Sequence, residues 1–332
     1  MHPLLRALRR SRNWLNKRLV QVQNEWLRNE RVFGHPFQLT LEPGNVCNLR
    51  CPLCPTPTRE ARLPSGLLRY DDAVRILDRF PYTVQVVLSN WGEPFLNKDI
   101  FRIIRAAKER DIRVQIESNF TLFDEAKSRA LVESGLDVLV VALDGCSQET
   151  YEKYRVGGRF ADVIDNLRTL RRVQDELGNQ RTEVRWKFVV NRFNEHEVDD
   201  ARELAHELGM TFHVLTIWTP PAEKEHWLPR VPLHTAGRNV RGGPPRCHHL
   251  WQAVSVNFNG DVFPCCSEFS PSDRLVNALE APFEDVWNSE EYRRRRRINR
   301  GAVDCSRCHK DRDTNWYKAW IGADAPRDGD PN

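Results

Sequence analysis

Apolar residues along this chain follow two spacings, one typical of strands and one typical of helices. Short β-rich runs recur six times, and the first five are followed by stretches with apolar residues at helical spacing. The predicted strands cover residues 37–42, 84–89, 112–118, 138–143, 183–190 and 211–217. The predicted helices cover residues 71–80, 98–110, 123–134, 160–177 and 195–208. Repeated βα units build a parallel sheet, so we expect an α/β fold, a partial (β/α)6 TIM-like barrel over residues 37–217 with its chemistry on loops at the C-terminal strand ends.

The segments outside the repeat are predicted to be smaller units. Residues 1–36 contain a basic amphipathic helix, whose apolar face we expect either to pack on the barrel or to attach peripherally to an anionic membrane. That face consists of Leu4, Leu8, Leu15, Leu19, Val22 and Trp26. Residues 218–246 are rich in Pro, His and Gly and are predicted to be a linker or a lid, and residues 321–332 a frayed tail. Residues 247–320 are predicted to form a small C-terminal domain.

That C-terminal segment carries a hairpin signal and a cluster of cysteines. Asn259-Gly260 sits between alternating apolar positions over residues 254–263, as in a tight β-hairpin. Five of the nine cysteines of the chain lie in the same segment. A short segment has a small hydrophobic core, so a metal site would supply much of its stability.

Charge and composition narrow the choice of partner and compartment. The 50 basic and 46 acidic residues give a net charge of +4, too even to indicate nucleic acid as the main partner. No stretch approaches the roughly 20 apolar residues of a membrane helix, and the N-terminus lacks the apolar core of a signal peptide, so we expect a cytoplasmic location. Clustered cysteines in that reducing compartment indicate metal ligation before disulfides.

The first cysteine cluster lies in the loop after the first predicted strand. Cys47, Cys51 and Cys54 are spaced so that one loop can place three thiolates around one metal centre. A zinc site normally takes a fourth ligand nearby, but no His or Cys occurs between Cys54 and Cys146. A bound cofactor is therefore the favoured fourth ligand, and unrelated cysteines or a zinc knuckle are the alternatives.

This triplet resembles the signature of the radical S-adenosylmethionine (SAM) superfamily, in which SAM chelates the open iron of a 4Fe-4S cluster. Gly92-Glu93-Pro94, after the second strand, resembles the GGEP element of that superfamily, with Trp91 in place of its first glycine. The resemblance implies that Glu93 holds the SAM ammonium group.

Two further segments extend the resemblance. Ser118 and Asn119, at the end of the third strand, resemble the polar pair that reaches the SAM ribose or carboxylate; an ordinary turn is the alternative. Asp144-Gly145 followed by Arg155 resembles the "DG…Y…R" segment, whose arginine pairs with the SAM carboxylate. From the residues alone, Asp144 is equally a turn cap and Arg155 a surface salt bridge.

The second cysteine cluster offers enough thiols to complete a metal site without an external ligand. It resembles the SPASM or shorter twitch extension of radical SAM proteins, although zinc fits the ligand count equally well. The resemblance implies an auxiliary 4Fe-4S cluster on Cys247, Cys265, Cys305 and Cys308. Cys266 is then an alternative ligand, an inert buried thiol, or a catalytic hydrogen-atom donor.

Several other residues carry weaker expectations. Lys187 and Asn191 are expected near the cofactor or substrate, and Cys146 is expected to be structural. His249 is expected to support a neighbouring ligand or to be an exposed turn residue. The arginine run 293–297 is predicted to be a solvated helix face, with a phosphate site as the alternative.

The resemblance implies an enzyme that reductively cleaves SAM to a 5′-deoxyadenosyl radical, which abstracts a substrate hydrogen atom. The leading hypothesis is oxidation of a hydroxylated small molecule, a sugar or aminocyclitol, with the auxiliary cluster accepting an electron and flavodoxin or ferredoxin as reductant. The alternatives are an epimerase that uses Cys266 and a peptide-modifying maturase. A non-catalytic iron-sulfur or zinc-binding interaction protein is the alternative of another class.

Overall fold

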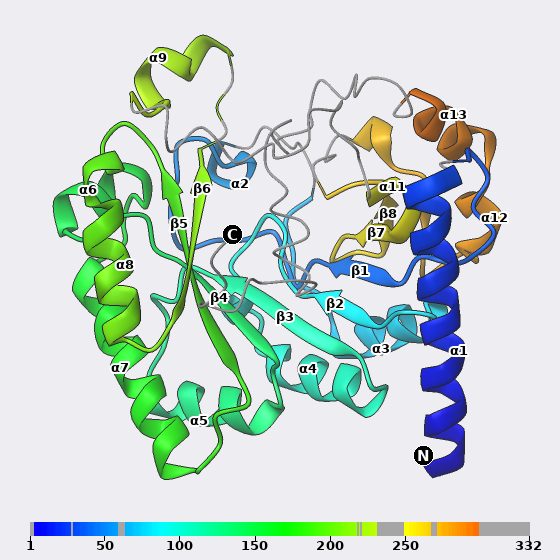
Figure 1. Cartoon of the computed structure of the whole chain (residues 1–332), viewed down its shortest axis with the longest axis horizontal. Helices are drawn as coiled ribbons and strands as arrows, with labels where there is room; N and C mark the ends of the chain where they lie inside the picture. The colour runs from blue at the N-terminus through cyan, green and yellow to red at the C-terminus, as the bar shows by residue number, and fades with distance from the viewer. Residues whose placement is uncertain are drawn as a thin grey trace.

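One curved, largely parallel sheet forms the centre of the molecule (Figure 1). The computed structural model describes residues 3–27, 29–58, 64–217, 219, 221–230, 249–266 and 271–298. In these ranges nine strands are hydrogen-bonded in the order β6-β5-β4-β3-β2-β1-β7-β8-β9. The barrel strands are β1 (Gln38–Leu41), β2 (Gln85–Val87), β3 (Arg113–Ser118), β4 (Val138–Ala142), β5 (Glu183–Val190) and β6 (Thr211–Thr216). All five ladders among them are parallel, which confirms the expected α/β partial barrel.

Helices cover the outer side of this sheet, as Figure 1 shows for α4, α5, α7 and α8. The barrel helices are α2 (Pro55–Thr58), α3 (Tyr70–Arg79), α4 (Ile100–Glu109), α5 (Glu125–Ser134), α6 (Gln148–Tyr154), α7 (Phe160–Glu176) and α8 (Val198–Glu207). Short turns of helix occur at η2 (Pro94–Leu96), η3 (Glu195–Glu197) and η4 (Pro221–Glu223). The five predicted helices agree with α3, α4, α5, α7 and α8 to within about three residues at either end. The pattern did not predict the short helices α2 and α6.

The predicted hairpin is present, and it extends the barrel sheet. Strands β7 (Ala253–Val256) and β8 (Asp261–Phe263) are antiparallel, and Gly260 in their turn has φ of 89°, which favours glycine. Strand β7 also pairs in parallel with β1, and β9 (Val276–Asn277) pairs with β8. The sequence predicted a separate small unit and gave no sign of this pairing.

Part of the predicted linker or lid is anchored to the barrel. Helix α9 (Lys224–Trp227) lies above the sheet in Figure 1. The buried ring of Trp227 packs edge-on against Tyr154 and Phe193, and its carbonyl accepts a hydrogen bond from the Arg192 amide at 2.9 Å. Residues 231–248 lie outside the described residues.

The N-terminal helix α1 (Pro3–Val22) and the π-helix η1 (Gln23–Leu27) stand beside the edge of the molecule that carries β7 and β8. The side of α1 and η1 that packs on the protein is mainly polar, with Asn13, Asn16 and Gln23 buried around Val20. The six apolar residues expected to form the packing face are exposed instead. The expectation that the apolar face packs on the barrel is therefore wrong. Side-chain hydrogen bonds hold the polar face against the protein, so the apolar face points to solvent.

The remaining helices are α11 (His249–Gln252), η5 (Pro271–Asp273), α12 (Glu284–Trp287) and α13 (Glu290–Ile298). The arginine run lies on α13, and its exposed members pair with nearby glutamates, such as Arg294 with Glu291. Arg296 differs because it is fully buried between the rings of Trp287 and Tyr292. Its guanidinium donates to the carbonyls of Glu30, Leu250 and Trp287 at 2.8–2.9 Å and to Asn288 Oδ1 at 3.0 Å. One arginine therefore joins three segments that are distant in sequence.

We expect Arg296→Met to lower the free energy of unfolding by about 3 kcal/mol, because three buried carbonyls lose their donor. Burial lowers the pKa of Arg296 to about 10, so the group is still charged at neutral pH. Arg294→Ala on the exposed side of α13 is the matched control, with an expected change within about 0.5 kcal/mol. Urea denaturation followed by circular dichroism measures both. Equal midpoints for the two variants would contradict the role assigned to Arg296.

Candidate functional site

The cysteine loop follows β1 and is held against the loop that follows β2. A Cβ atom on Gly92 would lie 2.1 Å from the Gly44 carbonyl oxygen and 2.9 Å from that of Val46, so only glycine fits there. The Glu93 amide donates to the Val46 carbonyl at 2.9 Å. The two loops therefore form one backbone unit at the carboxyl edge of the sheet.

Three of the predicted site residues meet around the buried carboxylate of Glu93. Its Oε1 accepts hydrogen bonds from the Ser118 hydroxyl at 2.8 Å and the Phe95 amide at 3.1 Å. Its Oε2 accepts the Asn119 amide at 2.9 Å. The Asn119 side chain points at Cys47, with Nδ2 at 3.8 Å from Sγ. Burial raises the pKa of Glu93, and these three donors oppose the shift by stabilising the carboxylate.

Asp144 and Arg155, the other predicted pair, bind each other directly. Arg155 Nε donates to Asp144 Oδ2 at 2.6 Å, and the pair is buried, which rules out a surface salt bridge. The second carboxylate oxygen accepts the Val189 amide at 2.8 Å. Arg155 Nη1 lies 3.8 Å from the Sγ atom of Cys51, so this guanidinium places a positive charge beside the cysteine loop.

The three thiols of the loop form a set suited to a metal cluster. Burial, with smaller contributions from nearby Glu93, Cys51 and Cys54, raises the pKa of Cys47 to about 11. Burial also raises the pKa of Cys51, against the opposing charge of Arg155. Buried thiols of this kind ionise when a metal supplies the missing positive charge. Three buried or half-buried thiols in one loop fit an iron-sulfur cluster that leaves one iron open.

The sequence did not single out an ion pair inside the barrel. Lys187 on β5 binds the carboxylate of Glu117 on β3. Burial lowers the pKa of Lys187 to about 8, and the nearby Cys51 and Cys54 act in the opposite direction. Lys187 therefore lies within electrostatic range of the cysteine loop, as expected, whereas the Asn191 side chain accepts from the Phe193 amide of its own loop at 2.9 Å. Glu117 could have been found from the sequence, because it is a charged residue inside a strand that was predicted to be buried.

A second carboxylate that the sequence did not single out is Glu42, directly after β1. It is fully buried and accepts hydrogen bonds from the Trp91 amide at 3.4 Å and the Phe258 amide at 3.5 Å. Burial raises the pKa of Glu42 to about 7. Its two oxygens connect the loop after β2 with the β7–β8 hairpin.

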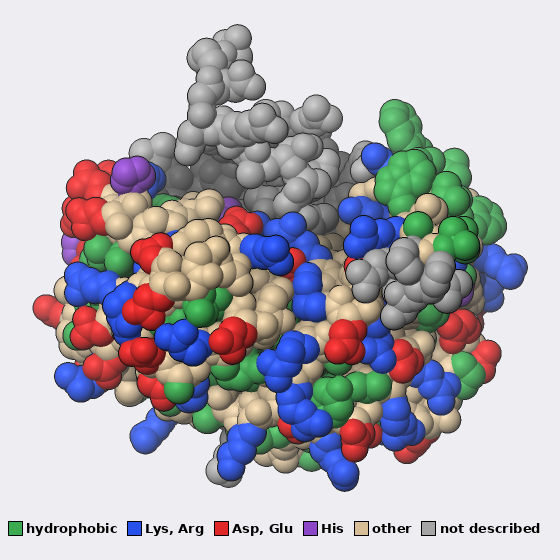
Figure 2. Space-filling model, turned by 90° about the horizontal axis from the view of Figure 1, so that it is seen from below, with side chains coloured by type: hydrophobic (Ala, Val, Ile, Leu, Met, Phe, Trp, Pro, Cys, Tyr) green, Lys and Arg blue, Asp and Glu red, His purple; other side chains and the backbone are tan. Residues whose placement is uncertain are grey.

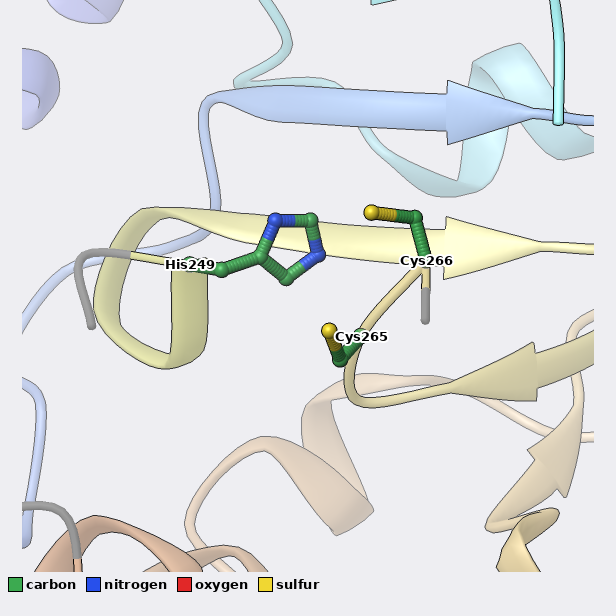
Figure 3. A group of neighbouring side chains, drawn as sticks. All are labelled: His249, Cys265 and Cys266. Carbon is green, nitrogen blue, oxygen red and sulfur yellow. The ribbon is translucent and has the colours of Figure 1, made fainter. Parts of the chain in front are cut away.

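The second candidate centre brings a histidine together with two adjacent cysteines. One ligand atom each of His249, Cys265 and Cys266 lies within 4.8 Å of the others, and Figure 3 shows the His249 ring projecting from α11 toward both sulfurs. The three ligand atoms are therefore close enough to bind one metal centre. His249 is buried here, not an exposed turn residue.

The other predicted ligands of this centre, Cys247, Cys305 and Cys308, lie outside the described residues. Cys146 is bound elsewhere, with its amide donating to Glu197 Oε2 at 2.9 Å.

One hydrogen bond links this centre to the first site. The Asn90 side chain, in the orientation that satisfies both neighbours, donates to the Cys266 carbonyl at 3.2 Å and accepts from Trp91 Nε1 at 3.2 Å. Asn90 lies two residues before Gly92, in the loop after β2. Both candidate metal centres therefore contact the same loop.

Comparison with known proteins matches the barrel and the C-terminal segment to two different domain families. Residues 41–180 match the radical SAM superfamily, and residues 247–309 match the iron-sulfur cluster-binding domain named SPASM. The AdoMet-dependent heme synthase of Methanosarcina barkeri is 28% identical over 171 residues, 51% of this chain and 47% of that protein. The PqqA peptide cyclase of Granulibacter bethesdensis is 28% identical over 179 residues, 53% of this chain and 46% of that protein. The chain thus spans less than half the length of these two relatives.

A solved structure shows the same fold. SuiB of Streptococcus suis, crystallised with S-adenosylmethionine, superposes with a TM-score of 0.62 at 17% identity, over 78% of this chain and 67% of that one. The matches to both domains require SAM and 4Fe-4S clusters as cofactors, in agreement with the donor sets described above. The chain belongs to the radical SAM superfamily and carries a C-terminal SPASM domain.

Proposed function

We propose that this radical SAM enzyme oxidises a hydroxylated small molecule, a sugar or an aminocyclitol, to the corresponding ketone. The net reaction converts SAM and a secondary alcohol into methionine, 5′-deoxyadenosine, the ketone and one proton. The substrate carbon loses a hydrogen atom to the deoxyadenosyl group, and the resulting carbon radical then releases a proton from its hydroxyl and one electron. That electron offsets the one spent on SAM cleavage, so the reaction needs an acceptor for it near the substrate.

The first centre is assigned to Cys47, Cys51 and Cys54. A 4Fe-4S cluster there, with SAM on its open iron, supplies the 5′-deoxyadenosyl radical. Around the cofactor we assign the other predicted contacts to this chain's own groups. The Glu93 carboxylate has about four acceptor sites and uses three internally, which leaves one for the SAM ammonium. Arg155 has free directions beyond Asp144 for the SAM carboxylate.

Asn119 and Ser118 are assigned to the polar end of SAM. The Ser118 hydroxyl and the Asn119 backbone amide are held on the Glu93 carboxylate, and Asn119 Nδ2 lies 3.8 Å from the Cys47 sulfur. A loss at Glu93 would therefore also misplace these two side chains. In this proposal Glu93, Ser118 and Asn119 bind the cofactor together.

The position of Cys266 is the observation that favours oxidation of the substrate and argues against its epimerisation. Its sulfur shares one potential metal site with Cys265 and His249, and the chain around it contacts the first site through Asn90. A cysteine that donates a hydrogen atom must carry a proton, whereas a metal-bound thiolate cannot. We therefore assign Cys266, in place of one of the four cysteines predicted above, as a ligand of the second 4Fe-4S cluster, which would then serve as the electron acceptor.

The Glu117–Lys187 pair supports a polar substrate. A partly buried carboxylate and ammonium inside the barrel can accept from and donate to substrate hydroxyl groups, and the carboxylate can take the proton that leaves with ketone formation. The substrate in this proposal is a small molecule, not a nucleic acid, and flavodoxin or ferredoxin supplies the electron for SAM cleavage.

Peptide modification is the second candidate function, because PqqA peptide cyclase is among the relatives.

The direct test uses anaerobically reconstituted protein with dithionite, SAM and sugars or aminocyclitols deuterated at each carbinol carbon. We expect deuterium in 5′-deoxyadenosine and a ketone product, detected by mass spectrometry. Cys51→Ala should reduce 5′-deoxyadenosine to background. Solvent deuterium at an inverted carbon would establish an epimerase instead. Zinc in place of iron, or no 5′-deoxyadenosine under these conditions, would exclude the enzymatic reading.

Glu93→Gln should weaken SAM binding by about ten- to hundredfold, because one acceptor oxygen becomes a donor facing the Asn119 amide or the Ser118 hydroxyl. Equilibrium dialysis with radiolabelled SAM measures the affinity. Glu197→Gln is a matched control, since Glu197 also accepts a backbone amide and a hydroxyl, from Cys146 and Thr150, away from the cysteine loop. If both variants lose affinity equally, the effect is one of general stability and not of the assigned contact.

The ligand assignment is tested in chains whose first cluster is removed by Cys47→Ala, Cys51→Ala and Cys54→Ala, which should retain about four irons. Adding Cys266→Ser or His249→Ala should lower the iron content or change the EPR spectrum of the reduced cluster. Cys146→Ser is the control and should leave both unchanged. An unaltered spectrum with full iron in Cys266→Ser would leave the cysteine free for the epimerase mechanism.

A further inference from the structure

The outer side of α1 and η1 carries a row of large apolar side chains in contact with solvent. Trp26 is 80% exposed, Leu4 62% and Leu15 61%, all far above the exposure of core residues. The other exposed apolar residues of these two helices are Leu8, Trp14, Leu19, Val22 and Leu27. Figure 2 shows a large hydrophobic patch over α1 at the upper right edge of the molecule. A contiguous patch of this kind marks an interaction surface.

Hydrogen bonds on the opposite side prevent the helix from turning this row inward. The Asn16 side chain donates to the His35 carbonyl at 3.0 Å and accepts from the His35 amide at 2.8 Å. About two turns on, Gln23 Oε1 accepts the Phe33 amide at 2.9 Å. A Cβ atom on Gly34 would lie 2.5 Å from Val20, so the helix also packs closely on this backbone. These hydrogen bonds and this close packing therefore hold the helix with its apolar row exposed.

The row is narrow, and the exposed Arg18 lies beside it. At 3.6 residues per turn, the row's positions in α1, which are Leu4, Leu8, Leu15, Leu19 and Val22, fall within about 60° of one another around the helix axis, with Trp14 beside them. Between Pro3 and Val22 the helix contains Arg6, Arg9, Arg10, Arg12, Lys17 and Arg18 and no acidic residue. The guanidinium of Arg18 lies 5.5 Å from the ring of Trp14, at the border of the row.

We propose that α1 and η1 form a docking surface for an anionic lipid membrane, with the helix axis in the plane of the interface. Leucine and tryptophan side chains would enter the boundary between headgroups and acyl chains, and Arg18 would contact the headgroups. Among the described helices none is long and apolar enough to cross a bilayer, so the contact is peripheral.

Charge favours the membrane over a second copy of the chain. A two-fold contact through this row is isologous and would place the basic residues of one α1 beside those of the other. α1 offers no acidic residue to pair with Arg18 across such a contact, so charge does not stabilise it. An anionic surface instead gains from the exposed Arg18, whereas Arg10 is already paired with Asp111.

The test is co-sedimentation of the reconstituted full chain with vesicles of phosphatidylcholine and phosphatidylglycerol at 3:1, compared with pure phosphatidylcholine, in low-salt buffer. We expect the chain to pellet with the anionic vesicles. Leu15→Glu with Leu19→Glu should lower the partition coefficient more than tenfold, because both exposed side chains lose apolar contact and gain negative charge. Arg18→Gln should lower it about fivefold on anionic vesicles only.

Val214→Glu is the matched control, since Val214 is exposed on β6 at the other edge of the sheet. It should bind as the unchanged chain does, and circular dichroism checks the fold of every variant. Failure of the unchanged chain to pellet, or binding by the Leu15 and Leu19 variant at the original strength, overturns the proposal. A dimer that this variant dissociates, without vesicle binding, would assign the row to a second copy.

Discussion

The close approach of the loops after β1 and β2 is the contact on which both metal-binding regions depend. Gly92 has no side chain because carbonyl oxygens of the cysteine loop occupy that space. The next residue, Glu93, then reaches the end of β3 and collects Ser118 and Asn119. Two residues earlier than Gly92, Asn90 holds the backbone of Cys266. One tight backbone contact thus sets the position of the cofactor residues and of the second centre together.

The barrel could be predicted from sequence because its strands are buried on both faces and its helices on one. β4 is buried along its whole length, and such a run has few alternatives to a central parallel strand. The cysteine spacing and the order of Glu93, Asn119 and Arg155 after successive strands gave most of the first site. Parallel strands end at the same edge, so chain order alone brings these residues to one place.

Other features have no local signal. The pairing of β7 with β1 joins residues more than 200 positions apart, and nothing in either strand specifies its partner. Glu117 is one charged residue in a strand until Lys187 is placed opposite it. Amphipathicity located the two faces of α1 but not which one is buried, because Asn16 and Gln23 meet backbone groups whose position depends on the fold.

The parallel pairing of β7 with β1 also determines how the two halves of this enzyme can move. A hinge between the barrel and the SPASM unit would have to break the ladder from Gln38 to Leu41, whose four residues are all paired with β7. The described strands of the SPASM segment are therefore continuous with the barrel sheet.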